Sequence, residues 1–209
     1  MSKGVYGGCV SEIDMRQAIK ETALELLVRR GYRGMSFGDI ATELDTTRAN
    51  IHYHFGGKQA LVEEVLGDYV QAMLSALRAI WAAENLSLGG KIEAMVGHSR
   101  ARFQHFNPSG REGQPWSLIS RLRQDGDLLS AKGRQMLDHF GSELAAIFAD
   151  ALSTARGRGE LAQNVEADEA ALLLAAIADN AAPITLTADG FARLEAIYAS
   201  LERLIERQG

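Results

Sequence analysis

The chain has 209 residues, and because 46% of them are hydrophobic it can bury a sizeable core and is not globally disordered. Its formal net charge of −5 does not exclude a nucleic-acid partner, because residues 29–58 carry five Lys/Arg against three Asp/Glu, together with His52 and His54. Only three prolines interrupt a sequence rich in alanine and leucine, which favours helices, and no strand-length alternating pattern occurs. We therefore predict an all-α fold.

No segment suits secretion or membrane insertion. Residues 1–10 lack the apolar core of a signal peptide, and the most apolar stretch, residues 170–178, is far shorter than the roughly 20 residues that span a bilayer. The lone Cys9 cannot form an internal disulfide and lies in a glycine-rich leader, residues 1–11, that we expect to be flexible. An incidental surface thiol is favoured over a redox sensor. We expect a cytoplasmic protein without membrane contact.

The N-terminal third predicts three short helical elements. A first helix over residues 12–30 carries one apolar stripe, which consists of Met15, Ile19, Ala23, Leu26 and Leu27. Gly31 is placed to end this helix. Ser36 and Asp39 form a capping box at the start of a second helix. Asp45 tolerates the left-handed turn that follows, and Thr47 can cap a third helix, residues 47–55.

The third helix ends at Gly56 and Gly57, and a connecting helix of about 39 Å then covers residues 58–83. Two short helices joined by a tight turn, after a supporting helix, are typical of a helix-turn-helix, so we predict a DNA-binding domain over residues 1–57. The remaining residues, 58–209, form a larger helical domain. Its further helices are predicted near residues 89–106, 115–123, 130–157, 167–182 and 189–207.

The stretch from Arg33 to Leu61, RGMSFGDIATELDTTRANIHYHFGGKQAL, resembles the signature of the TetR family of repressors. The detailed resemblance covers about residues 12–66, and beyond it only the helical layout agrees. It implies a dimeric DNA-binding domain and a C-terminal domain for effector binding and dimerisation. Three residues depart from the family pattern: Asp45 replaces a frequent glycine, Thr46 a small apolar residue and His52 a tyrosine.

The third helix carries the candidate DNA contacts. Its first residues face the major groove in a helix-turn-helix, where Arg48 would prefer guanine and Asn50 adenine. Lys58 combines a cation with a helix N-terminus, which suits a phosphate. The complete set expected at DNA is Arg33, Ser36, Thr47, Arg48, Asn50, His52, Tyr53, His54 and Lys58. No metal is expected, because His52 and His54 point about 200° apart on a helix, and no cofactor motif occurs.

The last two helices carry the predicted dimer interface. Residues 170–178 are apolar nearly all round, so this helix needs cover on several sides, and the final helix repeats apolar residues at helical spacing. Pairing with a second copy would give a four-helix bundle. The expected interface residues are Leu172, Leu173, Ile177, Phe191, Leu194, Ile197, Tyr198, Leu201 and Leu204. The alternative is that these residues only cover the core of their own subunit.

A pocket for an unidentified small-molecule effector is expected in the larger domain, because apolar side chains with a few polar groups are typical of ligand sites. The candidate lining residues are Met95, His98, Ser99, Arg102, Phe103, Phe106, Trp116 and Phe140. Arg102 is a candidate anchor for an anionic effector, although an arginine that snorkels to solvent or forms a salt bridge is the commoner arrangement. Trp116 and Phe140 are equally suited to plain core packing.

These patterns favour a DNA-binding transcriptional regulator, a repressor that binds a palindromic operator as a homodimer and is released by an effector. An enzyme is disfavoured, because no phosphate-binding loop, dinucleotide motif, His-Glu-x-x-His or nucleophile elbow occurs. A helical interaction module that has lost DNA binding is the main alternative, and an activator remains open.

Overall fold

The computed structural model describes residues 12–109, 113–187 and 189–206, so the glycine-rich leader with Cys9 lies outside the described residues. The described residues form an all-α fold without a named strand, as predicted from the composition. In chain order its elements are α1 (Glu12–Gly34), α2 (Phe37–Glu43), α3 (Arg48–Phe55), α4 (Lys58–Trp81), α5 (Leu88–Phe106), α6 (Leu118–Gln124), the 3₁₀ turn η1 (Gly126–Leu128), α7 (Ala131–Gly157), α8 (Ala167–Asp179), α9 (Ala181–Ile184) and α10 (Phe191–Ile205).

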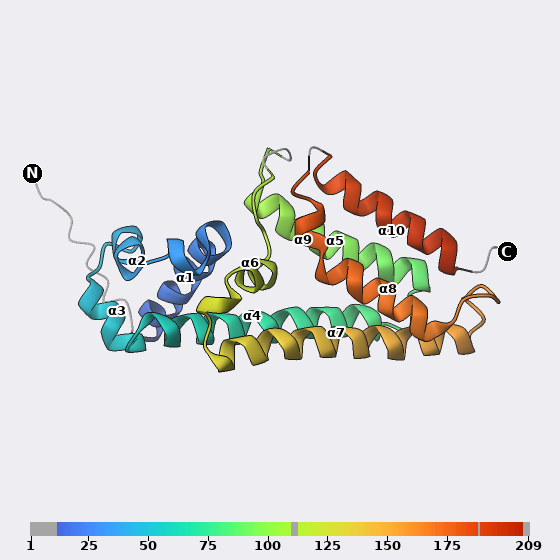
Figure 1. Ribbon diagram of the computed structural model, residues 1–209, viewed down its shortest axis with the longest axis horizontal. Helices are drawn as coiled ribbons and strands as arrows, with labels where there is room; N and C mark the ends of the chain where they lie inside the picture. The colour runs from blue at the N-terminus through green and yellow to red at the C-terminus, as the bar shows by residue number, and fades with distance from the viewer. Residues whose placement is uncertain (1–11, 110–112, 188, 207–209) are drawn as a thin grey trace, which may run out of the picture.

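Helix α4 runs along most of the molecule and joins its two parts (Figure 1). At one end α1, α2 and α3 gather around its first turns, and towards the other end α7 runs beside it while α5, α8 and α10 complete the larger part (Figure 1). Of the helices within the described ranges, none is both long and apolar enough to cross a membrane.

Local signals explain the small N-terminal unit. The Ser36 hydroxyl accepts from the Asp39 amide at 3.2 Å while the Asp39 carboxylate accepts from the Ser36 amide at 2.9 Å, so the predicted capping box is confirmed. Thr47 Oγ1 accepts from the Asn50 amide at 3.1 Å and begins α3. Asp45 adopts a φ of 48°, the left-handed turn conformation predicted for it.

Several helix boundaries differ from the predicted ones, and two of these differences have clear local causes. Helix α6 begins at Leu118, because the Ser117 hydroxyl accepts from the Ser120 amide at 3.3 Å and caps it there. The helix predicted over residues 167–182 divides at Asn180 into α8 and α9. Pro183 explains the division, since its ring in one continuous helix would clash with the carbonyl of the residue four positions earlier.

The predicted dimer residues separate into two groups. Phe191, Leu194, Tyr198 and Leu201 are buried within the subunit, because this face of α10 packs on α5. Within one subunit these four side chains are already covered, so they leave little surface to face a second copy. The remaining group is on the surface: Leu172 is 70% exposed, Leu173 53% and Leu204 70%, whereas Ile177 and Ile197 are half-buried.

The two parts also meet where α1 bends. Gly31 has φ 72° and ψ −176°, which interrupts the helix at the residue where the sequence predicts its end. The next amide, that of Tyr32, donates to Asp125 Oδ2 at 2.7 Å, just beyond the end of α6. Arg33 adds an ion pair to Asp127 of η1 at 3.3 Å. The bend in α1 thus gives the larger part a point of attachment.

Replacement of Gly31 by alanine is expected to weaken this attachment. A Cβ atom at residue 31 would lie 2.5 Å from Asp125 Oδ2 and 2.8 Å from Arg121 Nε, in addition to the strain of a positive φ. The matched control is Gly56→Ala, where φ is 69° and the space around a Cβ is open. In urea unfolding, Gly56→Ala should lose about 1–2 kcal/mol from its backbone alone. Gly31→Ala should lose about 1 kcal/mol more; equal losses would contradict the role given to Asp125.

Candidate DNA-binding surface and effector cavity

Helix α3 presents an open surface at the end of the molecule. Thr47, Arg48, His52 and Tyr53 are exposed, and Tyr53 is the most exposed large hydrophobic side chain among the described residues, at 74%. The opposite side of α3 is anchored, because Ile51 and Phe55 are buried in the core. A tyrosine held outward by a short anchored helix is well placed to contact an external partner.

Arg48 lies across the neighbouring helix. Its guanidinium approaches Gly38 of α2 so closely that a Cβ there would lie 2.5 Å from Nη2. Among the described residues no carboxylate forms an ion pair with Arg48, so its charge is available at the surface of α2 and α3. Asn50 is half-buried and its amide donates to Thr46 Oγ1 at 3.0 Å, an interaction that a contact with adenine would have to replace.

Four predicted contacts are engaged elsewhere. Arg33 pairs with Asp127, and the Ser36 hydroxyl caps α2. Lys58 Nζ lies 4.6 Å from the centre of the Tyr32 ring; burial lowers the pKa of Lys58, an effect that Asp125 and Asp39 oppose. The His52 ring packs edge-on against Phe37 at 4.7 Å, and its Nδ1 is 3.3 Å from the Gly56 carbonyl oxygen. These groups would have to change partners to reach a phosphate or a base.

His54 is half-buried beside Tyr53, and the centres of the two rings are 5.4 Å apart. Its backbone carbonyl accepts from Arg16 of α1, which also pairs with Glu64 of α4 and lies 4.2 Å over the Phe55 ring. Arg16 therefore fixes the end of α3 relative to α1 and α4. No group of three or more potential metal ligands occurs in the part of the chain that the structure describes.

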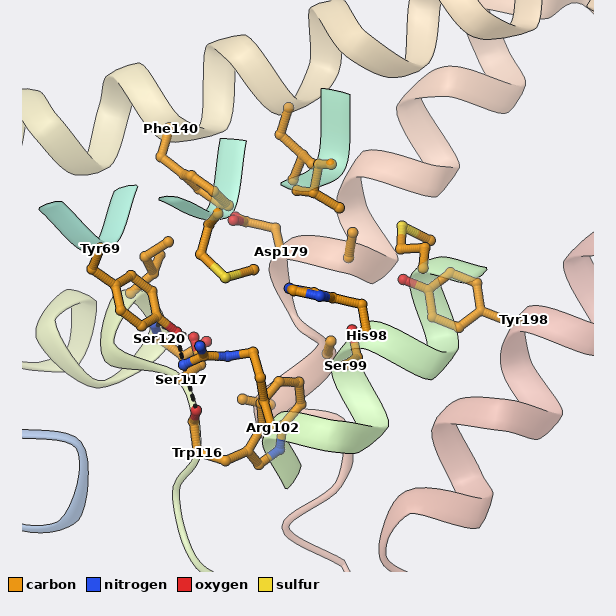
Figure 2. A pocket seen from close by; sticks show the side chains of 18 residues that line it. Tyr69, His98, Ser99, Arg102, Trp116, Ser117, Ser120, Phe140, Asp179 and Tyr198 are labelled. Carbon is orange, nitrogen blue, oxygen red and sulfur yellow. Dashed lines mark hydrogen bonds between the residues drawn. The ribbon is translucent and has the colours of Figure 1, made fainter. Parts of the chain in front are cut away.

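The larger part contains a partly open cavity of ≈ 50 Å³ between α4, α5, α6, α7, α8, α9 and α10. Figure 2 shows that polar and apolar side chains from these different elements converge on it. The lining residues are Tyr69, Met73, Leu77, Met95, His98, Ser99, Arg102, Trp116, Ser117, Ile119, Ser120, Phe140, Leu144, Ala178, Asp179, Ala181, Ala182 and Tyr198.

Six of the eight predicted ligand residues line this cavity: Met95, His98, Ser99, Arg102, Trp116 and Phe140. Phe103 and Phe106 do not, which corrects the prediction for these two residues. Phe103 packs on Phe191 at 5.2 Å, and Phe106 lies beneath the Arg29 guanidinium of α1. Phe103 points about 100° away from Arg102 around the helix. Phe106 lies on nearly the same face as Arg102 but about one turn further along α5, where it meets α1 instead of the cavity.

Arg102 is the cationic group of the cavity. Its Nη2 donates to the Tyr69 hydroxyl and to the Trp116 carbonyl oxygen at 3.4 Å, and its guanidinium lies 4.6 Å over the Tyr69 ring. Burial raises the pKa of Tyr69, an effect that Arg102 partly offsets, so the phenol is neutral near pH 7. Arg102 consequently has no ion-pair partner among the described residues, and its buried Nε has no hydrogen-bond partner there.

Two further polar atoms lie buried without a partner within the described residues. His98 Nε2 is one, and burial followed by the nearby Arg102 lowers the pKa of His98, so its imidazole is neutral near pH 7. Asp179 Oδ1 is the other, although Oδ2 of the same carboxylate accepts from Arg123. The cavity thus holds one unpaired cation, one neutral imidazole and one carboxylate that a second arginine neutralises.

Sequence reasoning missed several lining residues. Tyr69 lies among the buried apolar residues of α4, whose spacing indicates core packing rather than a polar site. Ser117 caps α6 and Ser120 lies in it, and this helix is too short for a periodic signal. Asp179 did carry a signal, because it is the first charge after the apolar run of residues 170–178 and lies where α8 turns into the core. A carboxylate at the end of such a run is a candidate for a polar site.

An anchored helix-turn-helix with an exposed third helix is joined by α4 to a helical domain with a cavity, an arrangement compatible with a helix-turn-helix transcriptional regulator. Residues 19–65 match the family model described as bacterial regulatory proteins, tetR family. The probable HTH-type transcriptional regulator YttP of Bacillus subtilis (strain 168) is 30% identical over 41% of this chain and 40% of its own length. The HTH-type transcriptional repressor BepR of Brucella suis biovar 1 (strain 1330) is 24% identical over 78% of this chain and 77% of its own.

The fold extends this similarity along the chain. The crystal structure of a putative transcriptional regulator from Saccharomonospora viridis in complex with choline superposes with a TM-score of 0.75 and 23% identity, covering 94% of this chain and all of that one. Residues 19–65 therefore carry a helix-turn-helix segment like that of the tetR family, and the chain as a whole shares the fold of the solved regulator.

Acidification is expected to destabilise the fold partly through His98. The pKa of His98 is lower in the folded than in the unfolded chain, so the unfolded chain binds a proton first as the pH falls. The contribution of neutral His98 to the free energy of unfolding is therefore complete above the usual pKa of 6.5 and is lost as the pH falls below it. In urea unfolding between about pH 7 and pH 5, wild type should lose more stability than His98→Gln. The exposed His139 supplies the control, and His139→Gln should follow wild type; a steeper loss in His98→Gln would contradict the assignment.

Proposed function

We propose that this regulator is a repressor that binds a palindromic operator as a homodimer and releases it when a small molecule occupies the cavity. In this proposal residues 58–209 form the effector-binding and dimerisation domain. The observation that carries it is the position of α6, which borders the cavity at its first residues and touches the DNA-binding unit at its end. BepR, which is named as a transcriptional repressor, supports repression rather than activation.

DNA binding would use the exposed surface of α3. The unpaired Arg48 and the outward Tyr53 lie on the helix whose N-terminal part enters the major groove in helix-turn-helix proteins. Lys58, at the N-terminus of α4, would reach a phosphate by leaving the Tyr32 ring. Asp45 brings a negative charge to the turn, which opposes phosphate binding and makes the cationic contacts more important.

A homodimer would use the leucines left exposed on two helices. Leu172 and Leu173 on α8, and Leu204 on α10, are each at least half exposed. Exposed apolar side chains mark interaction surfaces, and a two-fold axis would pair those of α8 and α10 with a second copy. The two copies of α3 would then meet successive major grooves about 34–36 Å apart.

Release would pass through α6. Ser117, Ile119 and Ser120 border the cavity, while Asp125 accepts from the Tyr32 amide of α1. A ligand that repositions the first turn of α6 therefore shifts the group that holds α1. DNA affinity would fall if the ligand binds better to the subunit arrangement with the wrong spacing. The choline complex of the Saccharomonospora viridis protein supports small-molecule binding by this fold.

DNA binding is tested with the purified protein and genomic fragments, beginning upstream of its own gene, at two salt concentrations. Wild type should bind a palindromic site more weakly at high salt. Arg48→Ala should weaken specific binding about 10- to 100-fold, since one bidentate base contact contributes about 1–3 kcal/mol. The control is Arg158→Ala, which removes one cation beyond the far end of α7. A folded dimer that binds no site would favour an interaction module.

Dimerisation is tested by placing charges on the exposed leucines. The double variant Leu173→Glu/Leu204→Glu should sediment as a monomer at micromolar concentration, because a buried carboxylate pair would lack partners across the interface. It should also lose operator binding. Leu186→Glu is the matched control, because Leu186 is an exposed leucine outside α8 and α10. A double variant that remains dimeric would place the interface elsewhere.

A further inference from the structure

The cavity gathers three buried polar atoms that have no hydrogen-bond partner among the described residues: Arg102 Nε, His98 Nε2 and Asp179 Oδ1. Buried polar atoms in folded proteins nearly always have a partner, so three exceptions around one cavity require an explanation. They come from α5 and from the end of α8, and Figure 2 shows all three side chains directed into the same space. Polar atoms of a bound molecule would supply the missing partners.

The charges of the lining specify the sign of that molecule. Arg102 is a permanent cation whose contacts are a neutral phenol and a carbonyl oxygen. The one carboxylate of the lining, Asp179, is paired with Arg123 outside the cavity. The excess charge that a ligand meets is therefore positive and lies at Arg102. A carboxylate on Arg102 Nε would gain a charge-assisted hydrogen bond, whereas a cation would meet repulsion.

Asp179 specifies a second group. Its free Oδ1 can only accept, so it requires a donor such as a hydroxyl. The neutral imidazole of His98 lies between Arg102 and Asp179 in Figure 2 and can donate or accept through Nε2. The rest of the wall is largely apolar, with Met73 and Leu144 among its members, so the remainder of the ligand would be hydrocarbon.

The size of the cavity limits how large the hydrocarbon part of the ligand can be. Its volume of ≈ 50 Å³ is smaller than the roughly 150 Å³ of a protein cavity that holds benzene, and far below the roughly 300–1,000 Å³ of sites for drug-sized ligands. A hydroxycarboxylate of about four carbons has about as many non-hydrogen atoms as benzene, so the cavity has to widen by movement of its side chains to hold one, and a larger ring system would require more widening.

We infer that the cavity binds a short-chain hydroxycarboxylate, with the carboxylate on Arg102 and the hydroxyl on Asp179. This inference rests on the proposed function, in which the same cavity is the effector site, and it adds the chemical class of the effector. The cavity would select this class of ligand because it holds a cationic donor, Arg102, at one end and an acceptor, Asp179, at the other.

The test is calorimetric titration of the full-length protein without DNA. The probes are sodium 3-hydroxybutyrate, sodium butyrate, the neutral 3-hydroxybutyramide and choline chloride. Wild type should bind 3-hydroxybutyrate most tightly, and the amide about 10- to 100-fold more weakly, because the amide lacks the charge that pairs with Arg102. Equal binding of the amide or of choline, or no carboxylate binding at millimolar concentration, would overturn the inference.

Variants locate the two ends of the ligand. Arg102→Gln should weaken 3-hydroxybutyrate about 10- to 100-fold, and Arg102→Lys, which keeps the charge, should weaken it less. Arg100→Gln is the matched control, because Arg100 lies on the same helix but pairs with Glu195 outside the cavity. Asp179→Ala, which removes the acceptor oxygen, should abolish the preference for 3-hydroxybutyrate over butyrate. The inference would also be overturned if Arg102→Gln is folded, as judged by circular dichroism, and binds 3-hydroxybutyrate as tightly as Arg100→Gln does.

Operator release is measured separately, so the two proposals can fail independently. Binding that depends on Arg102 without release of DNA would leave the ligand class standing and contradict the effector role. Release of DNA by the amide or by choline, without release by the carboxylates, would support the regulator and overturn the ligand class.

Discussion

Burial of α4 in both parts of the molecule is the constraint on which the rest of the structure depends. Its first turns place Leu61 and Val65 in the core beneath α1, and its later turns place Leu74 and Trp81 in the core of the larger part. Because a helix transmits a displacement along its axis, neither part can move alone without exposing apolar surface. The attachment of Asp125 to α1 adds a second connection, so the orientation of α3 is held at two points. In the proposed mechanism, a ligand that acts on α6 would therefore have to shift both connections to reorient α3.

The sequence predicted those features that depend on neighbours in the chain. The side chains of Ser36 and Thr47 accept hydrogen bonds from backbone amides three residues later, and Asp45 adopts the left-handed turn between two helices. These roles follow from residue type and spacing alone. The division at Asn180 was not predicted. Pro183 gives its cause, but proline is also tolerated in the first turn of a helix, so its presence alone does not reveal a break between two helices.

Features that depend on packing between distant helices were less predictable. The apolar spacing of α10 revealed a buried stripe but not its partner, and Tyr198 and Leu201 prove to face α5 of the same subunit. In the same way, Arg102 and Phe103 are adjacent in sequence, and only the positions of α4 and α10 decide which one reaches the cavity. The polar partners of the cavity come from helices separated by many residues, which no local pattern brings together.

The leucines exposed on α8 and α10 have a further consequence if they pair two copies as proposed. The species that recognises a palindrome would then be scarce whenever the monomer is dilute, so the fraction of occupied operators would rise with the square of the monomer concentration. The number of regulator molecules in a cell would set a threshold for repression, and a change in the rate of their synthesis could alter gene expression even without any change in effector.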